Sequence, residues 1–181
     1  MKKYLLELLS TRLIVGLLTV VQLTTFFGFS DDQNEYTVKA LFIYNFTKYV
    51  EWPEQNISPQ FKIGVLGESP IVEKLTLILK GKKIYNRTIE VNEIKNIDEA
   101  ADCQIIFISK NASDKLKPYL DRFSQNEILI VTEDRNMAEK GAGINIIEKD
   151  QRMKFEMNDT AIKKAGLKVA NQLYELAIVI R

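Results

Sequence analysis

Short apolar runs alternate with helical patterns along most of the chain. Four such runs predict strands at residues 61–66, 88–94, 104–109 and 127–132. Apolar residues at spacings of three and four between these runs predict helices at about residues 71–79, 112–123 and 136–140. The last two strand runs are almost continuously apolar, as expected for strands that are covered on both faces. Strands that alternate with helices predict a single three-layer α/β domain, with a largely parallel sheet flanked by helices.

A further strand with two different faces is predicted near the C-terminal end. Its alternating side chains are the polar Arg152, Lys154, Glu156 and Asn158 and the apolar Met153, Phe155 and Met157. Successive side chains of a strand point to opposite sides, so one face is polar and the other apolar. We expect this strand to pair with one at residues 144–147 as an antiparallel hairpin. Two interpretations are open: a sheet edge protected from aggregation by its charges, or an edge that recognises a partner.

Residues 36–50 (YTVKALFIYNFTKYV) predict a helix with one apolar face. Helical spacing places five residues on that face: Val38, Leu41, Phe42, Asn45 and Tyr49. Lys39 and Lys48 are expected to face water. Pro53 cannot continue a helix and disfavours helical geometry at Trp52, so the helix ends with an aromatic residue at its exit.

Residues 159–180 predict a single long helix. Its apolar stripe consists of Ile162, Ala165, Val169, Leu173, Leu176 and Ile180. Asn158 precedes the first turn, and its side chain is of the type that caps a helix N-terminus.

The first thirty residues are set apart from this pattern. Basic residues at positions 2, 3 and 12 precede an uncharged stretch of 17 residues, 13–29. A basic start followed by an apolar block and small residues is typical of a secretory signal peptide. The block is also close to the shortest membrane span, so an uncleaved anchor is the second interpretation. We therefore expect residues 1–30 to direct export to the periplasm and residues 31–181 to form the folded domain.

Composition excludes several classes of chemistry. The chain has 181 residues, with 25 Lys and Arg against 24 Asp and Glu, one Cys and no His. Without histidine, Ser-His-Asp and Cys-His catalysis, imidazole zinc sites and a histidine pH switch are excluded. The first thirty residues carry three of the basic residues and one of the acidic ones, so the rest is one charge negative. This near balance predicts no nucleic-acid partner.

No motif for a cofactor, a metal or catalysis stands out. Gly64 and Gly67 lack the further glycines or the lysine of a phosphate-binding loop, and the carboxylates are scattered. Cys103 precedes an apolar strand without cationic neighbours, so we expect it to be buried, with a disulfide between two chains as the second interpretation. We expect no catalytic residues, no cofactor and no metal.

Five segments of the chain resemble one known family. Residues 38–53 (VKALFIYNFTKYVEWP) resemble the opening signature of the YfiR-like (HmsC-like) periplasmic proteins, a helix that directly follows a signal peptide. Further segments resemble the family in the same order, at residues 61–67, 81–89, 103–108 and 141–158. The resemblance covers essentially all of residues 31–181.

The resemblance implies a regulator rather than an enzyme. Similar members repress an inner-membrane diguanylate cyclase by binding its periplasmic sensor portion, and so repress biofilm formation. An outer-membrane lipoprotein can sequester the repressor, and members form homodimers. Similar domains also occur beside sensor histidine kinases, which are the second class of membrane partner.

Eight residues match the family's motifs and are therefore candidates for partner binding: Asn45, Lys48, Trp52, Arg87, Arg152, Phe155, Glu156 and Asn158. We expect the helix exit at Trp52 and the strand at residues 152–158 to form or support a partner surface. A second function is also open, a small-ligand-binding module with a crevice at the carboxyl ends of the strands, near Gly67 and Ser109. A hydrolase that uses carboxylates is the third interpretation.

Overall fold

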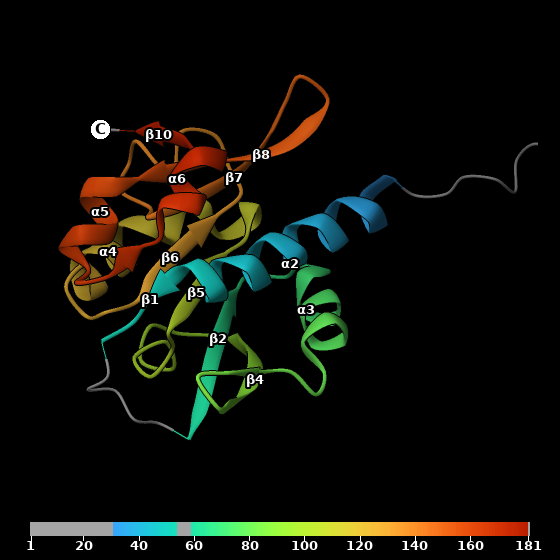
Figure 1. The fold of residues 1–181 in the computed structure, drawn as a ribbon, viewed down its shortest axis with the longest axis vertical. Helices are drawn as coiled ribbons and strands as arrows, with labels where there is room; N and C mark the ends of the chain where they lie inside the picture. The colour runs from blue at the N-terminus through green and yellow to red at the C-terminus, as the bar shows by residue number, and fades with distance from the viewer. Residues whose placement is uncertain (1–30, 54–58, 181) are drawn as a thin grey trace, which may run out of the picture. The chain divides into compact units, whose positions relative to one another are not determined.

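An eight-stranded sheet forms the centre of the computed structural model, which describes residues 31–53 and 59–180 (Figure 1). The strands follow the spatial order β10-β8-β7-β6-β5-β2-β4-β3. Their bounds are β2 (Gln60–Leu66), β3 (Lys83–Ile84), β4 (Arg87–Ile94), β5 (Ile105–Ile108), β6 (Leu129–Thr132), β7 (Ile144–Lys149), β8 (Arg152–Asn158) and β10 (Ile178–Ile180). The predicted segment 1–30 lies outside the described residues.

Most neighbouring strands run parallel, as the sequence predicts. The antiparallel pairs are β3 with β4 and β7 with β8, and the other pairs of this sheet are parallel. The hairpin of β7 and β8 is the one predicted near the C-terminal end. A second, two-stranded sheet joins β1 (Val50–Glu51) to β9 (Lys168–Val169).

Helices cover both faces of the sheet and complete the three predicted layers. Alternate residues of β5 separate the two cores, because Ile105 and Phe107 join one buried cluster and Ile106 and Ile108 join the other. The first cluster receives side chains from α2 (Asp31–Tyr49), α3 (Ile71–Leu79), α5 (Asp159–Lys164) and α6 (Asn171–Leu176). The second receives them from the 3-10 helix η2 (Lys110–Lys115) and from α4 (Leu116–Phe123). The fold class predicted from the sequence is therefore confirmed.

The helix α2 is present, but the prediction of its buried face is wrong. Its buried residues are Lys39, Ala40, Ile43, Phe46 and Thr47, whereas Val38 and Leu41 are 36% and 44% exposed. Most sides of this helix carry apolar residues, so spacing alone does not select one face. The residues that pack against α2 select its buried face instead.

Aromatic rings fix α2 on the sheet. The ring of Phe46 is fully buried, and its centroid lies 5.2 Å from that of Phe155 on β8. Phe42 lies 5.6 Å from Phe155 and stacks on Phe46 at 6.2 Å. Edge-to-face aromatic pairs at these distances are favourable beyond the area that they bury.

The single long helix predicted for residues 159–180 is wrong. The segment instead forms α5, β9, α6 and β10. Gly166 ends α5 with a φ of +78°, where its N–H and that of Leu167 bond to the carbonyl oxygens of Lys163 and Ile162. This is the Schellman arrangement, in which glycine takes the left-handed conformation after the last helical turn. The predicted cap is confirmed, since Asn158 Oδ1 accepts a 2.8 Å hydrogen bond from Ala161 N.

The strand β10 also corrects the interpretation of β8 as a sheet edge. Residues 178–180 pair with residues 156–158 of β8, so only the first half of β8 has β7 as its sole neighbour among the described strands. The helix predicted at 136–140 is a series of turns. None of the helices in the described part of the chain combines the length and apolarity needed to span a bilayer.

The contact between α2 and β8 predicts a large and specific effect on stability. Phe46→Ala should lower the free energy of unfolding by about 3–5 kcal/mol, because it opens a cavity in the core. Leu41→Ala on the same helix should cost about 0.5 kcal/mol, since Leu41 is partly exposed. Urea unfolding followed by circular dichroism measures both, and equal losses would contradict the observed rotation of α2.

Candidate partner surface

The end of α2 gathers four of the eight candidate residues. Asn45 and Lys48 lie on its last turns, Trp52 follows β1, and Arg87 begins β4. Three further residues, Tyr44, Lys82 and Tyr85, lie among them and were not among the candidates. We call these seven residues the α2 exit surface.

Two lysines from different elements meet at one aromatic ring of this surface. The ammonium of Lys48 lies 3.9 Å from the centroid of the Tyr44 ring, and that of Lys82 lies 4.9 Å from it. Lys48 also donates a 3.4 Å hydrogen bond to Asn45 Oδ1. The ring face attracts both cations. It therefore concentrates positive charge between α2 and the end of α3.

Trp52 is held in place by both its nitrogen and its ring. Its Nε1 donates a 3.2 Å hydrogen bond to the carbonyl oxygen of Gln104, which precedes β5. Its ring packs edge-on against Phe61 at 5.1 Å, and the guanidinium of Arg87 lies 5.3 Å from the same Phe61 ring. Trp52 and Arg87 thus take up fixed positions around Phe61, although neither is fully buried.

Tyr85 projects from the tight turn between β3 and β4. Tyr85 and Asn86 have φ angles of +49° and +63°, and they form the two-residue loop between Ile84 and Arg87. Such positive φ angles at both positions belong to the hairpin turns that suit twisted strands, but they are rare for a bulky residue. The Tyr85 hydroxyl donates to the carbonyl oxygen of Val50 at 3.2 Å, while the residue remains 56% exposed. An aromatic residue inside a two-residue turn is the sequence signal that could have identified it.

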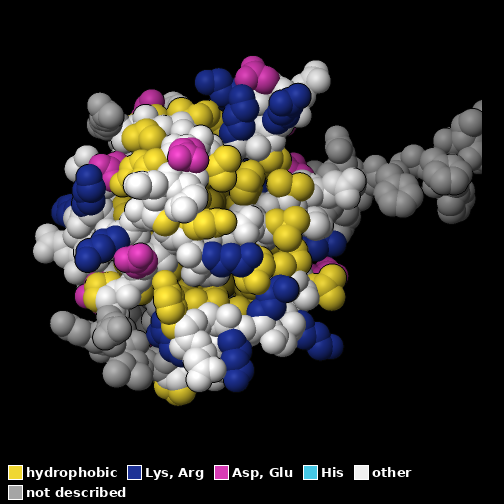
Figure 2. Space-filling view, in the orientation of Figure 1, with side chains coloured by type: hydrophobic (Ala, Val, Ile, Leu, Met, Phe, Trp, Pro, Cys, Tyr) yellow, Lys and Arg dark blue, Asp and Glu magenta, His cyan; other side chains and the backbone are white. Residues whose placement is uncertain are grey.

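Figure 2 shows the face of the molecule that carries α2. Hydrophobic side chains form a band across this face, and Lys and Arg side chains lie above it, around the β7–β8 hairpin, and below it, where α3 and β4 are seen in Figure 1. Val38 and Leu41 are the large apolar residues of α2 that are exposed. The surface therefore combines apolar, aromatic and cationic groups, as protein interfaces do.

The four candidates on β8 do not join this surface. Phe155 is buried against α2, and Arg152 is exposed at the start of the strand. Glu156 and Asn158 point to the opposite face of the sheet from Phe155. Only Phe155 supports the α2 exit surface, through its contact with the helix.

Glu156 and Asn158 have structural partners. Asn145 is fully buried on β7, where its side-chain amide donates to Glu156 Oε2 at 2.9 Å. Thr132 on β6 donates to Asn145 Oδ1 at 2.8 Å, so one chain of hydrogen bonds crosses three strands. Asn158 donates to the carbonyl oxygen of Ala138 at 2.8 Å in addition to capping α5.

The crevice expected near Gly67 and Ser109 is filled by the protein itself. A Cβ atom on Gly67 would lie 2.3 Å from Ser109 Oγ and 2.4 Å from Asn111 Oδ1. The Ser109 hydroxyl lies 2.8 Å from the carbonyl oxygen of Leu66, which ends β2. Gly67 has a φ of +87°, so both its backbone and its surroundings require glycine.

A buried ion pair also lies at the carboxyl ends of the parallel strands. Lys39 on α2 is 5% exposed and donates to Glu133, which follows β6 and has a side chain that is 2% exposed. The other oxygen of Glu133 accepts from Lys110 N at 3.0 Å. Burial alone would lower the pKa of Lys39, but its hydrogen bonds to Glu133 and Glu35 outweigh this effect and raise it. The expectation that Lys39 faces water is therefore wrong. Its side chain instead lies at the carboxyl ends of the strands, where many α/β proteins bind ligands.

The sequence that forms these elements matches a known family. Residues 36–178 match the family model described as YfiR/HmsC-like. The chain belongs to the YfiR/HmsC-like family. Members of this family are regulators that act in the periplasm.

Two solved structures are similar to this YfiR/HmsC-like protein. A conserved domain protein from Vibrio cholerae O1 biovar eltor str. N16961 has a TM-score of 0.55 at 12% identity, covering 81% of this chain and 60% of that one. The ABC domain in complex with L-Trp from Streptococcus pneumonia has a TM-score of 0.45 at 13% identity, covering 66% of this chain and 55% of that one. This chain thus spans less than two thirds of the length of either structure, and the likeness to the first concerns the fold alone. No curated protein matches the chain.

The described residues of this YfiR/HmsC-like protein contain no group of three or more Cys, Asp or Glu side chains arranged to hold a metal. Cys103 is buried, as predicted, and its sulfur lies 3.9 Å from the carbonyl oxygen of Glu99. Burial raises the pKa of its thiol to about 11. The thiolate, which is the reactive form, is therefore rare at neutral pH.

The ion pair predicts non-additive effects on stability. Lys39→Met should lower the free energy of unfolding by about 3–5 kcal/mol, because it leaves the Glu133 carboxylate buried without its cation. The double variant K39M/E133Q should be more stable than K39M, since the amide oxygen can still accept from Lys110 N. Lys117→Met breaks an exposed pair with Asp121 and should cost at most about 1 kcal/mol. Denaturant unfolding measures the loss of stability in each variant. If the loss in K39M/E133Q equals the sum of the losses in K39M and in E133Q alone, this coupling is ruled out.

The buried thiol predicts a slow reaction in the folded protein. At pH 8, Cys103 should react with a chromogenic disulfide reagent at least on the order of a hundredfold more slowly than in urea, because a pKa near 11 leaves little thiolate. The rate should rise as the pH approaches the pKa. Rapid, complete labelling of the native protein at pH 8 would show that the thiol is accessible instead.

Proposed function

We propose that this YfiR/HmsC-like protein represses an inner-membrane diguanylate cyclase, and so biofilm formation, by binding the periplasmic sensor portion of that enzyme. Membership of the family supports a regulatory role in the periplasm. We further propose that the regulator forms a homodimer and that an outer-membrane lipoprotein can sequester it. A sensor histidine kinase is the alternative membrane partner.

The α2 exit surface is the observation that carries this proposal. Tyr44, Trp52 and Tyr85 present aromatic rings there, each held by a contact within the protein. Tyrosine, tryptophan and arginine are enriched at the residues that contribute most to binding between proteins. Rings that are already fixed lose little conformational freedom when a partner covers them.

The charges of this surface favour an acidic region on the partner. Lys48 and Lys82 share the Tyr44 ring, and Arg87 lies beside Phe61. Complementary charge accelerates association and fixes the orientation of two proteins. The exposed side chains of Val38 and Leu41 add apolar area along the same helix.

Repression through this surface follows from a difference in affinity. A regulator inactivates a two-state enzyme only if it binds the inactive state more tightly than the active one. Moving the enzyme from 1% to 99% inactive requires a difference in affinity of about 10⁴-fold. Competition by a lipoprotein for the same surface would then release the enzyme without any chemical reaction.

The proposal predicts selective loss of partner capture when the surface charge is reversed. Residues 31–181 serve as bait for detergent-solubilised membranes of the source organism. The K48E/K82E variant should recover at least about tenfold less membrane enzyme than the unchanged chain, because two cations of the surface become anions. K115E/K117E is the matched control: it makes the same change of charge on the other face of the sheet and should recover the normal amount.

The identity of the captured protein decides between the two partner classes. A recovered diguanylate cyclase with a periplasmic sensor region supports the proposal, and a recovered kinase supports the alternative. If folded bait recovers neither, the proposal is wrong. Equal recovery with K48E/K82E would instead place the partner surface elsewhere on the protein.

A further inference from the structure

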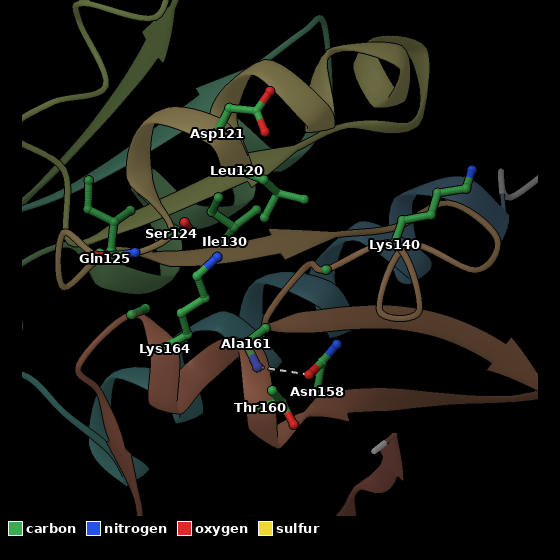
Figure 3. A pocket seen from close by; sticks show the side chains of 13 residues that line it. Leu120, Asp121, Ser124, Gln125, Ile130, Lys140, Asn158, Thr160, Ala161 and Lys164 are labelled. Atoms are coloured by element: carbon green, nitrogen blue, oxygen red, sulfur yellow. Dashed lines mark hydrogen bonds between the residues drawn. The ribbon is translucent and has the colours of Figure 1, made fainter.

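A cavity of about 630 Å³ lies between α4 and α5 (Figure 3). Leu120, Ile130 and Ala161 supply apolar surface to it, and Ser124, Lys140 and Lys164 supply polar groups. Its volume lies in the range of small-molecule sites. The cavity is beside the start of β6, at the opposite end of the parallel strands from the closed crevice at Gly67.

Two lysines, Lys140 and Lys164, contribute positive charge to the lining of the cavity. Lys164 extends from α5 into the space below α4, as Figure 3 shows. Lys140 and Lys164 form no salt bridge with the described residues. The one carboxylate in the lining, Asp121, is paired with Lys117 at 2.8 Å. Because Asp134 interacts electrostatically with Lys140, Lys164 is the cation of the lining that is left for a ligand.

The side chain of Asn158, one of the polar residues of the lining, is already in use. Asn158 Oδ1 accepts a hydrogen bond from Ala161 N, and the Asn158 amide donates one to the carbonyl oxygen of Ala138, both at 2.8 Å. It is thus part of the wall and not a free ligand. Charge recognition is left to Lys164, with the hydroxyls of Ser124 and Thr160 as additional donors.

We infer that this cavity binds a small organic anion. The carboxylate or phosphate group of the ligand pairs with Lys164, and its apolar body lies against Leu120, Ile130 and Ala161. A charge-assisted hydrogen bond to an ammonium group is stronger than a neutral one, and the apolar walls exclude part of the water around it. This ligand site is separate from the α2 exit surface, so the inference does not depend on the proposed partner.

Four probe molecules test the inference on the purified protein. Phenylacetate and phenyl phosphate combine an apolar ring with an anion, phenethylamine replaces the anion by a cation, and inorganic phosphate lacks the ring. Calorimetric titration should detect saturable binding of at least one of the two aromatic anions at concentrations up to about 10 mM, and no comparable binding of the other two probes. Whichever aromatic anion binds more tightly identifies the carboxylate or the phosphate as the preferred group.

Two neighbouring lysines of α5 provide a matched pair of variants. Lys164→Ala should weaken binding of the aromatic anion about tenfold, because it removes the pairing cation. Lys163→Ala changes the same charge on the same helix without altering the cavity lining, and it should leave binding within about twofold. Both lysines are exposed, so both variants should fold, which circular dichroism checks.

Ala161→Leu tests the apolar wall independently, since it fills part of the cavity and should also weaken binding. The inference is overturned if neither aromatic anion binds, if phenethylamine or inorganic phosphate binds as tightly, or if the Lys163 and Lys164 variants bind equally well. Partner capture plays no part in these titrations, so their outcome is independent of the proposed function.

Discussion

The buried ion pair between Lys39 and Glu133 constrains most of this structure. A buried lysine keeps its charge without a large desolvation cost only if it is paired, and here the carboxylate comes from the residue that follows β6. The pairing fixes the rotation of α2 about its own axis. Ala40, Ile43 and Phe46 are then directed into the core, while Leu41 and Val38 remain at the surface.

This rotation also determines where binding can occur. Open α/β proteins commonly bind ligands at the carboxyl ends of their strands. Here this space is filled by Ser109, Asn111 and the Lys39–Glu133 pair. The outward face of α2 continues into Tyr44, Lys48 and the turn at Tyr85. A surface suited to a protein partner therefore lies at the end of α2. The cavity suited to a small anion lies at the amino ends of the parallel strands.

Strand β8 links several of these features. Phe155 supports α2 on one face of the sheet, whereas Glu156 joins the hydrogen bonds of Asn145 and Thr132 on the other. Asn158, at the end of the strand, caps α5 and forms part of the cavity wall. Most of the motif residues on this strand thus position neighbouring elements. Family motifs read along a sequence do not separate such residues from those that contact a partner.

Local patterns in the sequence determined most of the strands and helices between residues 60 and 158, the parallel sheet, the β7–β8 hairpin and the cap at Asn158, because each depends on neighbouring residues. They also placed Trp52 at a helix exit and Cys103 in the interior. Only the tertiary structure decided which face of α2 is buried, since that choice depends on Glu133, 94 residues away along the chain. It also decided the end of α5 at Gly166 and the pairing of β10 with β8, because burial of Leu167 and Leu173 in the core outweighs a helical spacing that continues past the glycine. The meeting of Lys48 and Lys82 at one ring likewise required the fold, because two elements far apart in sequence supply the charges.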